Sequence, residues 1–484
     1  MTQPVLVALE LSSQNGSLLQ AKLSASGAQA PPVSAPINVP PAMEEKCREF
    51  AEIRENMFDQ GRKYWLRKYA DRERELTKLL RLALLPDPLS KELAAQAGDC
   101  ADELLLLEVR TDDPRLDYLP FELLGMAIPE TRTQIVVWRG RNGSIDRLPV
   151  LRFLIVRAAP INKSTPQHED EVRAARSRVR RRVGPMVRTK TLRKSSFANF
   201  VLKAKKFKPG VIHLAMHGES TSKSTTLQFS LPSSNDPVSH PSLANYLGEL
   251  QSVTAVITTG CFTARPNEVD LSVSMARELV DLRVPAAIGM ASKVTPRAAK
   301  EFSDCLYASL AEAEPIVDAF ARSVLAIRRM QFFDRVLWSV PVLYSYGRNV
   351  IPFPNQGYFD VVERLEGVVQ DVAGLRNNLT RVSRMSADER RNEVGSISLD
   401  MAVVSQELSD VSGAGIPGRR DPEWPRKFEA QRGLIERRIG QVVTCLGQGR
   451  SAERRLGQVM PLLESALKRI EGLVAEEYPI FAKR

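Results

Sequence analysis

The chain has 484 residues, 43% of them hydrophobic, and a formal net charge of +11. This length allows one large core or two smaller ones, so we expect two domains. No apolar run is long enough for a membrane span, and the first residues lack the basic start of a secretory signal, so we expect a cytoplasmic protein. Five cysteines without Cys-x-x-Cys spacing and only four histidines indicate neither a disulfide framework nor a metal site, and we expect no cofactor.

The first 148 residues predict strands around a helical region. Residues 27–41 are rich in Pro and Ala and lack periodicity, which indicates an irregular connector. A charge-rich helical region is expected from Met43 to Leu84. Apolar runs that read as strands lie at residues 5–9, 18–23, 104–109 and 135–138, the first two separated by an Asn-Gly turn.

From residue 151 to about 350, strand-like and helix-like segments alternate, which predicts an α/β fold with a mostly parallel sheet. Two runs that read as buried strands, 211–216 and 253–259, lead directly to His217 and Cys261. Because the carboxyl ends of neighbouring parallel strands share one crevice, we expect the imidazole and the thiol to meet there. Such a pair is the minimum equipment of a cysteine nucleophile with its general base.

Positive charge is concentrated in one segment. Between Val172 and Gly218 there are fourteen Lys and Arg residues and no acid, so the rest of the chain has a net charge of 11 − 14 = −3. Val172, Ala175, Val179 and Val183 recur at helical spacing, which favours the solvated face of an amphipathic helix. Nucleic-acid binding is the alternative, but no known nucleic-acid-binding motif accompanies the charges, so we do not expect a nucleic-acid partner.

Beyond Pro354 the pattern becomes entirely helical. Apolar residues recur every three or four positions, which predicts a helical bundle over residues 355–484. The helices are expected near residues 359–382, 386–411, 424–446 and 451–476. The loop over residues 410–425 is the longest of the bundle and contains Gly-Arg-Arg, so it is a candidate for activating cleavage.

Several motifs resemble, in the same order, those of CHAT proteases, the caspase-like cysteine peptidases related to separases and metacaspases. Leu-Pro-Phe-Glu-Leu-Leu at 119–124 is similar to the Leu-Pro-Trp-Glu-Leu-Leu element of that family. The other motifs are His-Leu-Ala-Met-His-Gly at 213–218, Ile-Thr-Thr-Gly-Cys-Phe-Thr-Ala at 257–264, Ala-Arg-Glu-Leu-Val at 276–280, Val-Pro-Ala-Ala-Ile-Gly-Met at 284–290 and Trp-Ser-Val-Pro-Val-Leu-Tyr at 338–344.

The resemblance spans about residues 5–346 and implies a caspase-like sheet flanked by helices. We therefore expect a protease domain over 1–352, in which 1–148 is the non-catalytic part and 149–352 the catalytic part. The bundle over 355–484 lies outside the resemblance.

The resemblance also implies roles for single residues. Cys261 would be the nucleophile and His217 the base, while the backbone amides of Gly218 and Cys261 would form an oxyanion hole. His213 lies inside the expected strand, so we expect it to be packed in the core instead of acting in catalysis.

The sequence allows more than one composition of the pocket that would determine substrate specificity. Relatives that cut after Arg or Lys carry an acid where this chain has Lys293, so an acidic or neutral substrate residue would be preferred if Lys293 lines the pocket. Lys293 pointing to solvent is the alternative. Asp270 or Glu268, in the loop after Cys261, could supply a carboxylate.

The resulting hypothesis is a cytoplasmic cysteine endopeptidase that cleaves protein substrates. The family implies latency and activation by an upstream sensor or protease in a prokaryotic defence or cell-death pathway, so a protein activator is an expected partner. The alternative is a catalytically quiet, caspase-like adapter or scaffold that acts through its helical bundle, and the intact His217 and Cys261 argue against it. No membrane partner is expected.

Overall fold

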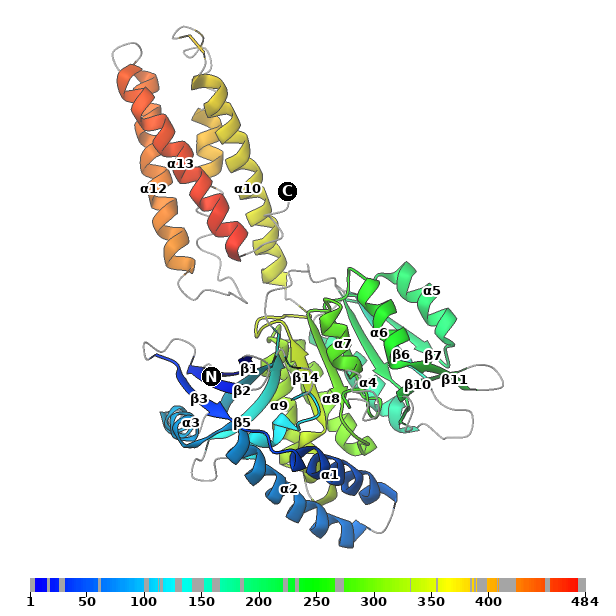
Figure 1. Ribbon diagram of the computed structural model, residues 1–484. Helices are drawn as coiled ribbons and strands as arrows, with labels where there is room; N and C mark the ends of the chain where they lie inside the picture. Colours follow the sequence, from blue (N-terminus) through cyan, green and yellow to red (C-terminus); the bar gives the residue numbers. More distant parts are fainter. Residues whose placement is uncertain are drawn as a thin grey trace. The chain divides into compact units, whose positions relative to one another are not determined.

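The structure is a computed structural model of the chain (Figure 1). It describes residues 5–14, 18–25, 31–59, 62–99, 104–111, 113, 116–126, 133–141, 152–158, 166–182, 187–220, 225–230, 235–265, 274–330, 332–353, 356–383, 385–386, 389, 398–406, 408, 424–448 and 453–477. The chain divides into two compact units, Met1–Phe353 and Pro354–Arg484. None of the described helices is long and apolar enough to cross a membrane.

The first unit is built on an eleven-stranded sheet with the order β3-β2-β1-β4-β5-β14-β13-β12-β8-β6-β7. The strands of its first half are β1 (Val5–Gln14), β2 (Leu18–Ala25), β3 (Val33–Ile37), β4 (Leu104–Thr111) and β5 (Gln134–Gly140). Those of its second half are β6 (Arg152–Arg157), β7 (Arg188–Arg193), β8 (Val211–Ala215), β12 (Ala255–Thr258), β13 (Ala286–Met290) and β14 (Pro341–Ser345).

Two parallel blocks of opposite direction make up this sheet. In the first block, β1, β4, β5 and β14 pair in parallel, with β2 and β3 added as antiparallel strands at the edge. In the second, β13, β12, β8, β6 and β7 also pair in parallel. The antiparallel pair of β13 with β14 joins the blocks. The expected α/β fold with a mostly parallel sheet is therefore confirmed.

Helices cover both faces of the second block. Along β6, Phe153 and Ile155 pack in the same apolar cluster as α4 (Pro166–Arg182), whereas Leu154 and Val156 pack in the cluster of α5 (Phe197–Phe207). This alternation follows from the two-residue period of a strand. The remaining helices of the unit are α1 (Ala42–Asp59), α2 (Arg62–Leu84), α3 (Asp87–Asp99), α6 (His240–Glu249), α7 (Met275–Asp281), α8 (Pro296–Leu310) and α9 (Ile316–Arg328), with 3₁₀ helices η2 (Phe121–Met126) and η4 (Phe332–Ser339).

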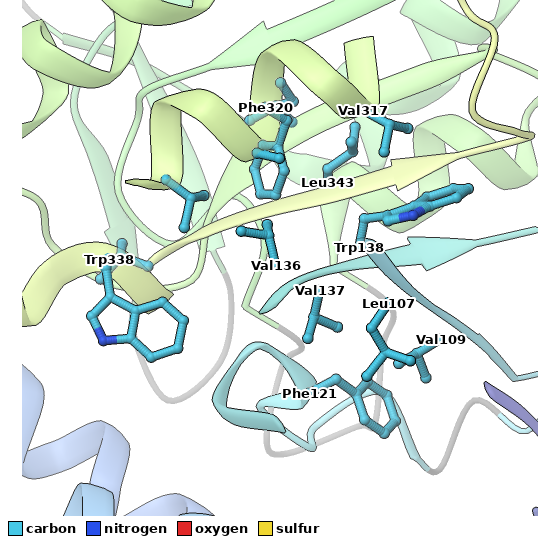
Figure 2. Packing of buried hydrophobic residues seen from close by; sticks show 14 of the residues in the cluster. Leu107, Val109, Phe121, Val136, Val137, Trp138, Val317, Phe320, Trp338 and Leu343 are labelled. Atoms are coloured by element: carbon cyan, nitrogen blue, oxygen red, sulfur yellow. The ribbon is translucent and has the colours of Figure 1, made fainter. Parts of the chain in front are cut away.

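Buried side chains cover both faces of β5. Figure 2 shows Val137 of β5 on the side of Phe121, and Val136 on the side of Val317 and Phe320 of α9. All of these side chains are buried. Because β5 is apolar on both faces, it belongs in the interior of the sheet, as its sequence predicts.

Several elements differ from the expectations. The connector over 27–41 is not irregular throughout, since β3 forms there, and the helical region over 43–84 is two helices. The Leu-Pro-Phe-Glu-Leu-Leu element forms a 3₁₀ helix, η2. A second, three-stranded sheet of β9 (Gly218–Ser220), β10 (Thr225–Ser230) and β11 (Asn235–Ser239) was not predicted.

The second unit is helical. Its long helices are α10 (Gln356–Ser383), α12 (Trp424–Gly447) and α13 (Glu453–Glu477), and residues 398–406 are also helical. Their apolar stripes meet in a core that includes Leu375, Met401, Ile435 and Leu463. Arg376 and Glu471 join α10 to α13 through an ion pair of 2.5 Å. Most of the loop expected over 410–425 lies outside the described residues.

Candidate functional site

His217 and Cys261 follow neighbouring strands that end at the same edge of the sheet. β8 and β12 pair in parallel, with His213 opposite Ile257 and Leu214 opposite Thr258. The pairing continues beyond the strands, because the N–H of Thr259 donates to the carbonyl oxygen of Leu214 (3.1 Å). His217 therefore lies just beyond the carboxyl end of β8, and Cys261 lies just beyond the carboxyl end of β12. The side chains of both residues are partly exposed.

Two glycines allow the strand ends to approach closely. A β-carbon on Gly218 would overlap the carbonyl oxygen of Cys261 and lie 2.9 Å from its carbonyl carbon. A β-carbon on Gly260 would lie 2.7 Å from Cδ2 of Leu227 and 3.2 Å from the carbonyl oxygen of Met216. Any larger residue would separate these backbones, so the absence of a side chain is what lets Gly218 lie against Cys261.

The turn that carries Cys261 is held by Thr263. Its hydroxyl donates to the carbonyl oxygen of Gly260 (2.9 Å) and accepts from the N–H of Met290 at the end of β13 (2.9 Å). The N–H of Ala264 donates in turn to the carbonyl oxygen of Met290 (3.0 Å). Phe262 takes the left-handed conformation (φ 65°), which lets the chain reverse directly after Cys261.

A chain of buried polar contacts connects this turn to the Leu-Pro-Phe-Glu-Leu-Leu element. The carbonyl oxygen of Thr263 accepts from the N–H of Ala276 in α7 (3.1 Å), and the next residue, Arg277, forms an ion pair with Asp117. The carbonyl oxygen of Asp117 accepts from Arg139 (3.0 Å), which also donates to the Glu122 carboxylate (3.0 Å). Burial of these groups is tolerable because the charges are paired and hydrogen-bonded.

The three-stranded sheet supports the segment that contains His217. The carbonyl oxygen of His217 accepts from the N–H of Gln228 in β10 (2.9 Å), and Gly218 of β9 lies opposite Leu227. Leu227 is fully buried and packs on Gly260, as the spacing above shows. The same strand thus contacts both sides of the candidate site.

His213 is buried, as its position inside β8 predicts. Its Nδ1 lies 2.8 Å from the hydroxyl of Tyr307, and its Nε2 lies 3.1 Å from Oε1 of Glu171. Glu171 also accepts from the hydroxyl of Ser303 (2.9 Å). These polar groups sit together between β8, α4 and α8, and burial raises the pKa of Tyr307 well above its usual value.

Of the three residues considered for substrate specificity, the structure describes only Lys293. Lys293 lies between β13 and α8, after the carboxyl end of β13, and is partly exposed. Asp270 and Glu268 lie outside the described residues. Within the described parts of the chain, no three His, Cys, Asp or Glu side chains are grouped in a way that would hold a metal ion.

The mostly parallel sheet with helices on both of its faces defines this molecule as an α/β protein. The family model for the CHAT domain matches residues 74–347, which is more than half of the chain, and the protein belongs to the CHAT-domain family. No curated protein matches the chain.

The family match begins later than the expected similarity. Residues 5–73 lie outside the match, although β1 pairs with β4 and thereby belongs to the same sheet. The motifs from 119–124 to 338–344 all lie within the match.

Sequence reasoning missed the residues that support the site. Thr263 and Arg277 lie within the motifs at 257–264 and 276–280, but no role was predicted for either of them, and Asp117 was not considered. One signal was available for Thr263, which is a hydroxyl residue two positions after the candidate nucleophile. The chain must turn sharply at the end of the buried strand, and hydroxyl side chains often hydrogen-bond to the backbone in such turns.

Proposed function

We propose that the protein is a cysteine endopeptidase in which Cys261 is the nucleophile and His217 its general base. The close approach of Gly218 to Cys261 is the observation that carries this proposal, because it puts the two strand ends and their possible donors at one point. Membership of the caspase-like CHAT family supports the same reaction class.

In the proposed reaction, His217 takes the proton of the Cys261 thiol and the thiolate attacks the scissile carbonyl carbon. The carbonyl electron pair moves to its oxygen, where the N–H groups of Gly218 and Cys261 would stabilise the negative charge. As the tetrahedral intermediate collapses, the carbon–nitrogen bond breaks and His217 returns the proton to the leaving amine. Water, activated by His217, then hydrolyses the thioester.

We further propose a cytoplasmic setting in which the enzyme is latent until an upstream sensor or protease activates it. The resemblance to regulated prokaryotic defence and cell-death proteases supports this proposal. A helical unit with a core separate from those of the sheet unit is also suited to receiving such an activator. Lys293, after the strand next to Cys261, would favour an acidic or neutral substrate residue if it lines the pocket.

The test compares Cys261→Ala and His217→Ala with the wild-type chain. Each is incubated with a peptide pool and with a library of peptidyl acyloxymethyl ketones, which alkylate a catalytic thiol without requiring an activator. Both variants should lose at least a thousandfold in hydrolysis and labelling, and the double variant should lose little more, because residues that act as one unit give non-additive losses.

Cys305→Ala is the matched control. Cys305 is a partly exposed thiol in α8 whose pKa is raised by burial, so its loss should leave labelling and hydrolysis unchanged. A wild-type chain that neither hydrolyses any peptide nor labels at Cys261 would contradict the proposal and favour the adapter.

A further inference from the structure

Among the described strands, β7 is an edge strand that pairs on one side only. It pairs with β6 from Arg188 opposite Arg152 to Arg193 opposite Arg157, and it is the last strand of the sheet in the described part of the chain. An edge strand of this kind presents a row of N–H and carbonyl groups that another extended chain can bind.

Positive side chains surround this open edge from three elements. On β7, Arg188 is exposed and Lys190 lies 5.6 Å from the ring of Phe207, so Lys190 leans toward α5. Lys203 lies one helical turn before Phe207 and therefore on the same side of α5.

The helix α4 contributes the other flank. Its Glu169 pairs with Arg157 at the carboxyl end of β6 (3.0 Å) and with Arg193 at the carboxyl end of β7 (3.7 Å), so this side of the helix lies toward the last two strands of the sheet. Arg176 and Arg180 follow Glu169 by seven and eleven residues, so they continue the same stripe along the helix. Both are exposed.

These five cations define what we call the basic edge: Arg176, Arg180, Arg188, Lys190 and Lys203. Among the described residues, no carboxylate lies within 4.0 Å of any of them. Other arginines of the same segment do have acidic partners, as Arg178 pairs with Asp304 (2.7 Å). In the described part of the chain, the five cations of the basic edge thus lack an acidic partner, and they flank the strand whose outer backbone groups are not paired with another strand.

The basic edge is close to the candidate site. β7, β6, β8 and β12 are parallel, so the carboxyl end of β7 lies on the same side of the sheet as His217 and Cys261, which follow the carboxyl ends of β8 and β12. Three strand spacings separate β7 from β12, or about 14 Å. About five extended residues would cover that distance.

We propose that the basic edge is an exosite that binds an acidic, extended segment of the protein substrate by adding it to the sheet beside β7. This inference rests on the proposed peptidase function. Opposite charges on paired strands stabilise the pairing, and like charges oppose it. The same side chains that prevent two copies of β7 from pairing therefore select an acidic strand.

A peptide fits this surface better than a nucleic acid does. The open row of β7 offers alternating donors and acceptors at the spacing of another peptide backbone, which a sugar–phosphate chain does not match. The cations also lie on α4 and α5, on opposite faces of the sheet, with the edge between them. An added strand lies between these flanks, within reach of both.

The first experiment measures binding by fluorescence anisotropy on the full chain. The probe is a short peptide of alternating Glu and Val, compared with the same peptide N-methylated at alternate backbone amides and with a single-stranded oligonucleotide of equal charge. The unmodified peptide should bind, and N-methylation should weaken binding at least tenfold because it removes backbone donors without changing charge. Equal binding of both peptides, stronger binding of the oligonucleotide, or no binding would overturn the proposal.

Variants locate the binding site. The double variant Arg188→Glu, Lys190→Glu should bind the acidic peptide at least tenfold more weakly, whereas Lys91→Glu, a charge reversal at an exposed lysine of α3, should not change binding. Melting curves verify that each variant is folded. Unchanged binding by the folded double variant would contradict the assignment to β7.

The second experiment separates the exosite from the peptidase itself. Two protein substrates share one scissile segment, and only one has an acidic tract upstream or downstream of it. The tract should raise kcat/KM about tenfold for the wild-type chain and not for the β7 double variant. Hydrolysis of both substrates at equal rates would overturn the exosite alone. If neither substrate is cut, the peptidase proposal fails and the segment bound in the first experiment cannot be assigned to a substrate.

Discussion

The turn that carries Cys261 depends on the hydroxyl of a single residue, Thr263. This hydroxyl connects the carbonyl of Gly260 to the N–H of Met290, and both partners are buried. Replacement by Val keeps the shape but leaves those groups without their partner, which typically costs about 1–3 kcal/mol for each buried group. We expect Thr263→Val to lower the free energy of unfolding and to slow alkylation of Cys261, as the turn loses its fixed geometry.

Urea unfolding and the rate of Cys261 alkylation by a small thiol-directed probe measure the two effects. Thr263→Ser retains the hydroxyl and should keep an alkylation rate close to that of the wild type. The role given to this hydroxyl would be wrong if Ser and Val reduced alkylation equally.

A second residue, His240, should make stability depend on pH. It is the first residue of α6, only 4% exposed, and burial lowers its pKa from 6.5 to about 3. The positive end of the helix dipole also disfavours the imidazolium. In the unfolded chain His240 binds its proton below about pH 6.5, so the folded state loses stability as the pH falls from there toward about 3.

His240→Phe removes the titrating group and keeps an aromatic ring. The difference in unfolding free energy between wild type and variant should change with decreasing pH by up to about 5 kcal/mol in favour of the variant. Denaturant unfolding at several pH values measures this difference. Two curves that stay parallel between pH 7 and 4 would rule out His240 as the source.

At the scale of elements, the close contact between the segments that follow β8 and β12 depends on the absence of a side chain at Gly218. Gly218→Ala would put a methyl group against the carbonyl of Cys261, so one of the two strand ends must move. We expect a loss of at least a hundredfold in hydrolysis, because displacement of about 1 Å in an active site can cost that much.

A matched glycine separates this effect from the chemistry of the substitution. A β-carbon on Gly440, inside α12, would meet no atom within 4 Å. Gly440→Ala should therefore stabilise the helix by up to about 1 kcal/mol and leave hydrolysis unchanged. Full activity of Gly218→Ala would show that the close approach is not required.

Strands were predictable where burial alone determines them. β8 and β12 are buried along their whole length, and the runs at 211–216 and 253–259 predict them within two residues at each end. β3 was missed because Val-Ser-Ala-Pro-Ile contains a proline and has little apolar character. It exists through pairing with β2 at the edge of the sheet, where a proline is tolerated.

The candidate site was predictable only as a pair of strand ends. The contact of Gly218 with Cys261 follows from the pairing of β8 with β12, whose partners, such as Val211 and Ala255, are more than forty residues apart in the chain, and no local pattern specifies this pairing. The support from Asp117 and Arg277 bridges still longer separations. A buried ion pair has no periodicity in sequence, so only the folded chain reveals it.

At the scale of the whole molecule, the two units have separate cores. Among the described side chains, the clusters of the first unit contain no residue beyond Phe353, and the cluster of the second unit contains none before Val368. A chain that ends after Phe353 should therefore fold, because it retains the contact of Phe353 with Phe153 (5.4 Å between ring centroids). Its melting temperature should lie within a few degrees of the corresponding transition in the full chain, and Cys261 should still react with a small thiol-directed probe.

Calorimetry of the truncated chain, the isolated residues 354–484 and the full chain checks this independence. The isolated bundle should show its own cooperative transition. Aggregation of the truncated chain would instead mean that the bundle buttresses the sheet. Retained labelling with loss of cleavage of the natural substrate would agree with an activating role for the bundle.

The position of β14 has a consequence for the order in which a ribosome releases this protein. β14 lies between β5 and β13 and is the last strand of the sheet to be synthesised. Cys261 leaves the ribosome 84 residues before Ser345, the end of that strand, so the nascent chain carries its thiol while the two blocks of the sheet are still unjoined. Because β13 supplies the Met290 partner of Thr263 and pairs with β14, the strand that supports the turn gains its own second neighbour only after β14 has been synthesised. The candidate site is therefore complete only after the sheet has closed, so an active form of the proposed peptidase would not arise beside other newly made chains on a polysome before that point.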